Sequence, residues 1–178
     1  PAEIAAGLAA IPMKDLQRFV GGAARMVRQG TARETATIAY GLACLHQEGA
    51  PPLQGWPDSY VLYVGHRSGY KDAETLVRAF ALVAPSHPDL ALVFGGGGPL
   101  TKPERELISG LDINSRVVHK SVSDSNMPSA YANAKLFVLS SQYEGFGLPI
   151  LEAMASGTPV LLANASALPE VGGDAAAY

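Results

Sequence analysis

Short apolar segments alternate with segments of helical periodicity from about Asp58 to the end of the chain. The apolar segments predict five strands, at residues 60–64, 90–94, 116–119, 136–139 and 159–163. The intervening segments predict helices at residues 73–84, 103–109 and 127–133, and a further helix that begins at Pro149. Strands and helices that alternate through short loops form a parallel sheet with helices on both faces. The sequence therefore predicts an α/β fold whose ligands bind at the carboxyl ends of the strands.

Residues 1–57 are predicted to form a separate helical segment and connector, and residues 58–178 the α/β domain. Residues 1–30 have a helical apolar pattern, residues 35–40 are predicted to be a short strand, and EGAPPLQGWPD is rich in proline and glycine. Basic side chains in residues 1–30 suggest peripheral contact with anionic lipid. A solvated helix face is the commoner explanation for such a pattern.

The bulk composition excludes some function classes. The formal net charge of −3 gives no electrostatic reason to expect a nucleic-acid partner. Cys44 is the only cysteine, so no intrachain disulfide can form and the reducing cytosol is the expected compartment. No apolar run reaches the roughly 18 residues that a transmembrane helix needs. We therefore expect a cytoplasmic protein, with peripheral contact to a membrane as the alternative.

The stretch EGFGLPILEAMASGTPV, residues 144–160, predicts a loop that leads into a helix. Gly145 and Gly147 allow the backbone to approach a ligand closely, and Pro149 suits the first helical position. The unpaired N–H groups at a helix N-terminus favour an anion such as a diphosphate. Glu144 before the helix and Glu152 within it are acceptors for sugar or ribose hydroxyls. Alternatively, Glu144 is a solvated loop residue and Glu152 only complements the helix dipole.

Arg67 and Lys71 flank the turn that follows the first predicted strand of the domain. An arginine fork and a lysine charge can together bind a diphosphate, although an arginine and a lysine at this spacing are also common on ordinary surfaces. The four glycines at 95–98 lack the lysine and hydroxyl of a phosphate-binding loop, so a flexible turn is the better interpretation. His46, His66, His87 and His119 lie far apart in the sequence without nearby acidic partners, so we expect no metal site.

YEGFGLPILEAMASGTPVLLANASALPEVGG closely resembles the signature of glycosyltransferase family 4, the retaining nucleotide-sugar enzymes of the GT-B fold. Glu144 and Glu152 correspond to its E-x7-E pair. The resemblance extends back over VLYVGHRSGYKDAETLVRAFALV. It implies a Rossmann-like donor-binding domain that is one half of a GT-B fold. The other half, which would bind a saccharide or lipid-linked acceptor, is expected upstream, and the family pattern is expected to continue beyond Tyr178.

The resemblance also implies a role for each site residue. Arg67 and Lys71 would hold the donor diphosphate, assisted by the backbone N–H groups of Gly147 and Leu148. Glu144 and the backbone of Gly145 and Phe146 would hold the donor sugar, and Glu152 the ribose. The donor would be a nucleoside diphosphate sugar, and no metal or other cofactor would be required. His66 stands where the family varies, and it is interpreted as lining the cleft rather than as catalytic. Together these roles predict hexosyl transfer to a hydroxyl, with little activity for this chain alone.

Three positions depart from the family pattern. Lys135 stands where an aspartate is usual and Ser140 where a proline is usual, and both differences are expected to affect packing only. Ser121 replaces a glycine before the loop that reads the base, which leaves base preference open.

Two other functions remain open as well: a nucleotide-sugar 2-epimerase, and a non-catalytic nucleotide-sugar-binding module.

Overall fold

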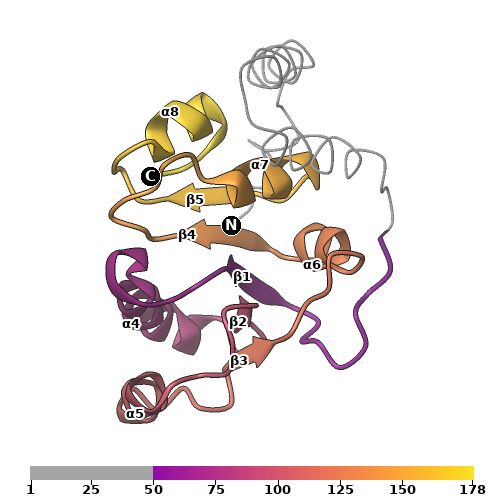
Figure 1. Cartoon of the computed structure of the whole chain (residues 1–178). Helices are drawn as coiled ribbons and strands as arrows, with labels where there is room; N and C mark the ends of the chain where they lie inside the picture. Colours follow the sequence, from indigo (N-terminus) through magenta and orange to yellow (C-terminus); the bar gives the residue numbers. More distant parts are fainter. Residues whose placement is uncertain (1–49) are drawn as a thin grey trace.

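A five-stranded parallel sheet forms the centre of the molecule in a computed structural model that describes residues 50–178 (Figure 1). The strand order is β3-β2-β1-β4-β5. The strands are β1 (Tyr60–Val64), β2 (Ala91–Gly95), β3 (Val117–Lys120), β4 (Leu136–Leu139) and β5 (Val160–Leu162). All five predicted strands are confirmed. The helix and strand predicted within residues 1–40 lie outside the described residues, and the domain boundary at residue 58 stays a prediction.

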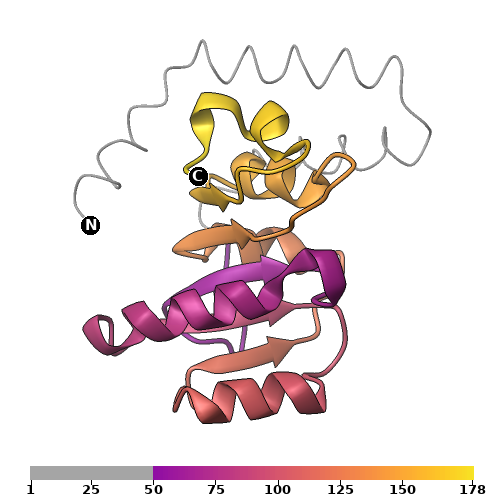
Figure 2. The same cartoon turned by 90° about the vertical axis from the view of Figure 1, so that its left-hand side faces the viewer.

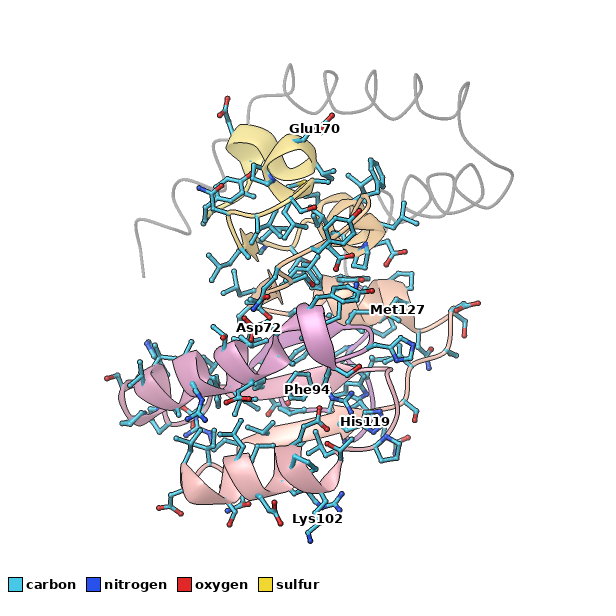
Figure 3. All side chains as sticks on the ribbon, turned by 60° about the vertical axis from the view of Figure 1, so that its left-hand side comes forward. Asp72, Phe94, Lys102, His119, Met127 and Glu170 are labelled. Atoms are coloured by element: carbon cyan, nitrogen blue, oxygen red, sulfur yellow. The ribbon has the colours of Figure 1, made fainter. Side chains whose placement is uncertain are left out.

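Helices cover both faces of the sheet, as predicted (Figures 1 and 2). α4 and α5 lie on one face, and α6 and α7 lie on the other. The helices are α4 (Ala73–Val83), α5 (Lys102–Gly110), α6 (Met127–Ala132), α7 (Leu148–Ala155) and α8 (Leu168–Gly172). The short helix α8, which was not predicted, packs on α7 and β5. The heads of α4 and α5, marked by Asp72 and Lys102, lie at the same end of the sheet (Figure 3).

The core consists of the two faces of the central strands. Every residue of β2 and the first four residues of β1 are buried, which is why these strands appear in the sequence as continuous apolar runs. Two buried tyrosines of β1 satisfy their hydroxyls within the protein. Tyr60 donates to the carbonyl of Ala130 at 2.7 Å, and Tyr63 donates to the carbonyl of His66 at 2.6 Å. Burial raises the pKa of Tyr60 to about 12, so its hydroxyl stays protonated.

The strand order reverses between β1 and β4, and this reversal fixes the position of the site. From β1 the chain proceeds to β2 and β3 on one side, whereas β4 leads to β5 on the other. The loops that follow β1 and β4 therefore diverge from adjacent strands. Open α/β sheets bind ligands at the carboxyl ends of the strands at such a reversal. Lys71 lies in the first of these loops and Glu144 in the second.

Candidate functional site

Lys71 and Glu144 meet at this strand reversal. The Nζ atom of Lys71 lies 2.6 Å from Oε1 of Glu144. The Lys71 side chain is 22% exposed and that of Glu144 is 12% exposed, so both side chains are largely shielded from solvent but remain partly accessible. The hydroxyl of Ser141, which is fully buried, donates to the same oxygen at 2.8 Å. Oε2 of Glu144 accepts no hydrogen bond from residues 50–178 and is available to a ligand hydroxyl.

Hydrogen bonds join the two loops that carry this pair. The backbone N–H of Gln142 donates to the carbonyl of Tyr70 at 2.7 Å. The hydroxyl of Ser140 donates to the carbonyls of Lys71 at 3.2 Å and Asp72 at 2.9 Å. The expectation that Ser140 affects packing only was therefore wrong, because this hydroxyl connects the end of β4 to the Lys71 loop. From a third loop, Ser166 donates to the backbone carbonyl of Glu144 at 2.9 Å.

The head of α7 presents a limited number of free N–H groups. Gly147 is the N-cap in the left-handed conformation, with φ of 86°, and no side chain caps the helix. The helix begins at Leu148, and Glu152 lies in its second turn. Pro149 was predicted to be the first helical residue, but it is the second. Pro149 has no N–H group, and the N–H of Ile150 donates to the carbonyl of Gly147 at 2.9 Å. Among residues 50–178 no backbone carbonyl accepts from the N–H of Leu148, so this group is left for a ligand.

Arg67 turns toward the glycine turn after β2 rather than toward Glu144. Its Nη1 donates to Gly96, and its Nη2 donates to Gly98 and Pro99, at 2.9 to 3.1 Å. Its Nε donates to Oε1 of Glu104 at 2.7 Å, and the guanidinium lies 5.2 Å from the centroid of the Phe94 ring. The side chain is only 3% exposed. Of the five N–H groups of an arginine, those on Nε and Nη2 and one on Nη1 are therefore engaged, and one remains.

Glu104, which the sequence interpretation did not select, supports both Arg67 and helix α5. Its Oε2 accepts from the backbone N–H of Thr101 at 2.6 Å and from the Thr101 hydroxyl at 2.9 Å, completing a capping box. Burial favours the neutral acid, but the hydrogen bonds from Arg67 and Thr101 outweigh burial and lower the pKa of Glu104. The T-x-x-E spacing was a signal for the helix start, but nothing local indicated the arginine.

Gly97 brings the loops after β1 and β2 into direct contact. A Cβ atom placed on Gly97 would lie 2.2 Å from the carbonyl oxygen of Gly65 and 3.0 Å from Nη1 of Arg67. Its φ of +69° is also one that residues with side chains rarely adopt. Residues 95–98 were interpreted as a flexible turn, and the turn is present, but its contacts hold it in place. The turn is fixed by Arg67 on one side and by the backbone of Gly65 on the other.

Glu152 contacts Tyr131 of α6 and does not take part in the ion pair between Lys71 and Glu144. The hydroxyl of Tyr131, a residue with no exposed surface, donates to Oε2 of Glu152 at 2.8 Å. Burial raises the pKa of Glu152, the hydrogen bond from Tyr131 opposes that rise, and the charge of Asp124 adds to it. Tyr131 was not selected from the sequence, where a tyrosine in a short apolar helix carries no distinguishing signal.

A pocket of about 590 Å³ lies beside this site, between the heads of α4 and α5. Its lining includes His66, Arg67, Gly97 and Glu104, but not Lys71, Glu144 or Glu152. The pocket therefore does not include the ion pair at the strand reversal. Within residues 50–178, no three His, Cys, Asp or Glu side chains gather closely enough to hold a metal ion. No helix in this range is long and apolar enough to cross a bilayer.

A comparison with protein families decides the identity of the domain. A family model described as glycosyl transferases group 1 matches residues 54–177. The chain belongs to the group 1 glycosyl transferases. This confirms the resemblance to glycosyltransferase family 4.

Curated relatives of this glycosyl transferase domain include mannosyltransferases. The chain is 59% identical over 54 residues to O-antigen chain mannosyltransferase B of Escherichia coli, covering 30% of the chain and 14% of the relative. It is 48% identical over 73 residues to MMP alpha-(1->4)-mannosyltransferase of Mycolicibacterium hassiacum, covering 40% and 18%. It is 32% identical over 117 residues to mannosylfructose-phosphate synthase of Agrobacterium fabrum, covering 61% and 26%. The chain thus spans about a quarter or less of the length of each.

Solved glycosyltransferase structures share the fold of this domain. Anabaena HepE in complex with UDP and glucose superposes with a TM-score of 0.56 at 25% identity, over 64% of this chain and 32% of that one. The pneumococcal O-GlcNAc transferase GtfA, in complex with UDP and GlcNAc, gives a TM-score of 0.55 at 23% identity, over 63% and 22%. The glycosyl transferase domain is therefore the Rossmann-like half of a GT-B fold, as the sequence predicted.

Proposed function

We propose that this domain binds the nucleoside diphosphate sugar donor of a retaining glycosyltransferase, which transfers a hexose to a hydroxyl acceptor. The ion pair between Lys71 and Glu144 carries the proposal. It places a cation and a carboxylate 2.6 Å apart at the strand reversal, in the loops that lead to α4 and α7. The cation can stabilise a leaving diphosphate, and the carboxylate can accept a hydrogen bond from a sugar hydroxyl.

Each group has a distinct part in the proposed reaction. Lys71 and the N–H groups of Gly147 and Leu148 stabilise the charge that grows on the diphosphate as its bond to the sugar breaks. Glu144 accepts from the sugar hydroxyls through its free Oε2, beside the backbone of Gly145 and Phe146. Glu152 accepts from the ribose. The acceptor oxygen bonds to the anomeric carbon on the face that the diphosphate leaves, and its proton passes to the departing phosphate.

Arg67 is the second proposed cation of the diphosphate site. In the observed geometry, one N–H group of its Nη1 is left for a phosphate oxygen. Its other four N–H groups hold the turn at residues 96–99 and Glu104 in place. We therefore assign Lys71 the larger share of diphosphate binding and Arg67 a combined role, as a ligand and as the support of the cleft wall.

No metal is included in the proposed reaction, since Lys71, Arg67 and the α7 N-terminus together supply positive charge to the diphosphate. Relatives named as mannosyltransferases support a hexose as the transferred group. The presence of UDP in the HepE structure supports a nucleoside diphosphate as the carrier. We place the protein in the cytoplasm, where nucleotide sugars would be its substrates, with a saccharide or lipid-linked acceptor bound by a second domain.

Isothermal calorimetry with UDP, UDP-glucose, GDP and GDP-mannose tests the proposal. Lys71→Ala should weaken the binding of the preferred nucleotide by about 10- to 100-fold, the equivalent of one charge-assisted hydrogen bond. Glu144→Gln should weaken the binding of the nucleotide sugar more than that of the nucleotide diphosphate, because Glu144 contacts the sugar.

Lys102→Ala is the matched control for the lysine variant. Lys102 is 81% exposed and pairs with Glu106 at 3.7 Å on the surface of α5, so its removal changes the net charge equally without touching the site. The proposal is wrong if Lys71→Ala and Lys102→Ala bind every nucleotide equally well.

A further inference from the structure

The carboxyl group of Glu152 is fixed from one side by a buried hydroxyl. Tyr131 has no exposed surface, and its ring packs edge to face on Phe137 with centroids 5.5 Å apart. The backbone carbonyl of Tyr131 accepts from the hydroxyl of Thr158 at 2.7 Å. The tyrosine is therefore held by its ring and its backbone. From this fixed position its hydroxyl donates to Oε2 of Glu152 at 2.8 Å.

This arrangement leaves the other carboxylate oxygen in a defined direction. A carboxylate has two oxygens that both accept hydrogen bonds, and among residues 50–178 Oε1 of Glu152 receives none. Glu152 is partly exposed, so Oε1 can be reached by a ligand. A glutamate side chain that moves freely loses rotamer freedom when it binds a ligand, and this loss lowers affinity. The hydrogen bond from Tyr131 already restricts Glu152 before a ligand binds, so less affinity is lost.

A buried hydroxyl on Tyr131 is unfavourable unless it makes a hydrogen bond. A phenylalanine at position 131 would fill nearly the same volume and keep the contact with Phe137. Here the hydroxyl is bonded to a carboxylate that the proposed function assigns to ligand binding.

We propose that Tyr131 is a positioning residue for recognition of the donor ribose: it holds Oε2 of Glu152 so that Oε1 accepts from a ribose hydroxyl. The inference rests on the proposed function, because it takes Glu152 as the ribose acceptor. It adds a residue from α6 to a site that otherwise comprises the loops after β1 and β4 and helix α7.

The test compares nucleotides with and without ribose hydroxyls, using the full 178-residue chain. The ligands are UDP and GDP and their 2′,3′-dideoxy analogues, measured by calorimetry. Wild-type protein should bind the preferred ribonucleotide about 10-fold more tightly than its dideoxy analogue. Tyr131→Phe should lower ribonucleotide affinity about three- to tenfold and leave dideoxynucleotide affinity unchanged. A merely structural role would weaken the binding of both nucleotides equally.

Glu152→Gln provides a second variant that does not depend on the behaviour of the tyrosine change. If Tyr131 acts through the carboxylate, adding Tyr131→Phe to Glu152→Gln should have no further effect on ribonucleotide binding. The inference is overturned if Tyr131→Phe binds the ribonucleotide as wild type does, or if it weakens the ribonucleotide and the dideoxynucleotide alike.

Failure of the inference can be told apart from failure of the proposed function. Equal wild-type binding of ribonucleotide and dideoxynucleotide would remove both Glu152 and Tyr131 from ribose recognition while leaving donor binding intact. Absence of binding to any of the four nucleotides would instead reject the proposed function and, with it, this inference.

Discussion

The absence of a side chain at Gly97 lets the loops after β1 and β2 pack directly on each other. Gly97 combines a left-handed φ of +69° with an approach so close that a Cβ atom would lie 2.2 Å from the carbonyl oxygen of Gly65. Gly96 has nearly the same φ, +72°, but no atom within 4 Å of a Cβ atom there. An alanine at Gly96 would therefore introduce backbone strain alone, whereas an alanine at Gly97 would introduce both backbone strain and steric overlap.

We predict that Gly97→Ala destabilises the domain by about 3 kcal/mol or more, and that Gly96→Ala costs about 1 kcal/mol. Both variants carry the strain of an L-residue at positive φ, but only Gly97→Ala forces the loops after β1 and β2 apart. Urea denaturation followed by circular dichroism measures both free energies of unfolding. Equal losses for the two variants would mean that the loops are not packed as closely as described.

Arg67 illustrates which site properties a sequence can predict. Its position in the loop after β1 followed from the apolar pattern and from the resemblance. The direction of its side chain did not, because its acceptors are the carbonyls of Gly96, Gly98 and Pro99, about 30 residues later in the chain. No local pattern encodes that choice.

The strands and helices were predictable because burial on both faces produces long apolar runs. The bounds of β1 and β4 match the prediction residue for residue, and those of β2 and β3 differ by one residue at each end. By contrast, α8 spans only Leu168–Gly172 and contains a proline and a glycine. A helix of five residues is too short to establish a helical period, so only its packing against α7 and β5 reveals it.

The capping box of α5 makes this element sensitive to acid. Because the folded-state pKa of Glu104 is lowered, its carboxylate contributes stability that is complete above its unfolded pKa of about 4.5. This contribution is lost as the pH falls below that value toward the folded pKa. We predict that Glu104→Gln costs about 2 kcal/mol at pH 7, and that the gap to wild type narrows below pH 4.5.

Glu106→Gln is the control on the same helix. Glu106 is 66% exposed and forms only a surface pair with Lys102, so its neutralisation should change stability by less than about 0.5 kcal/mol at pH 7. Urea unfolding at pH 7 and pH 4 distinguishes the two variants. If the difference in unfolding free energy between Glu104→Gln and wild type stayed constant with pH, the Glu104 carboxylate would not be the acid-sensitive group of α5.

At the scale of the whole molecule, the meeting of Lys71 and Glu144 was accessible to prediction. Both residues were selected separately, and the rule that ligands bind at the carboxyl ends of parallel strands brought them to one edge of the sheet. Their direct contact across 73 residues, and the support from Ser141, depend on exact loop geometry. The pairing of Glu152 with Tyr131 was likewise beyond reach, because it depends on how α6 packs against α7.

The domain covers 22% to 32% of the two solved glycosyltransferase structures described above. We therefore predict that the 178-residue chain binds a nucleotide sugar but transfers hexose at least about 100-fold more slowly than a protein that also carries an acceptor-binding domain. Transfer of radiolabelled sugar from the preferred donor measures both rates. Comparable rates would contradict the prediction, and donor binding without transfer in the longer protein would favour a binding module.

The proposed site lies at the carboxyl ends of the parallel strands, so the amino ends of the strands take no part in the proposed chemistry. Residues 111–116 and 133–135 connect helices to the amino ends of β3 and β4, and Lys135 is exposed there. A linker to a solid support attached at Lys135 would hold the protein with its donor cleft turned outward. The topology of the sheet would thus orient an immobilised donor-binding domain so that nucleotide sugars in solution could reach it.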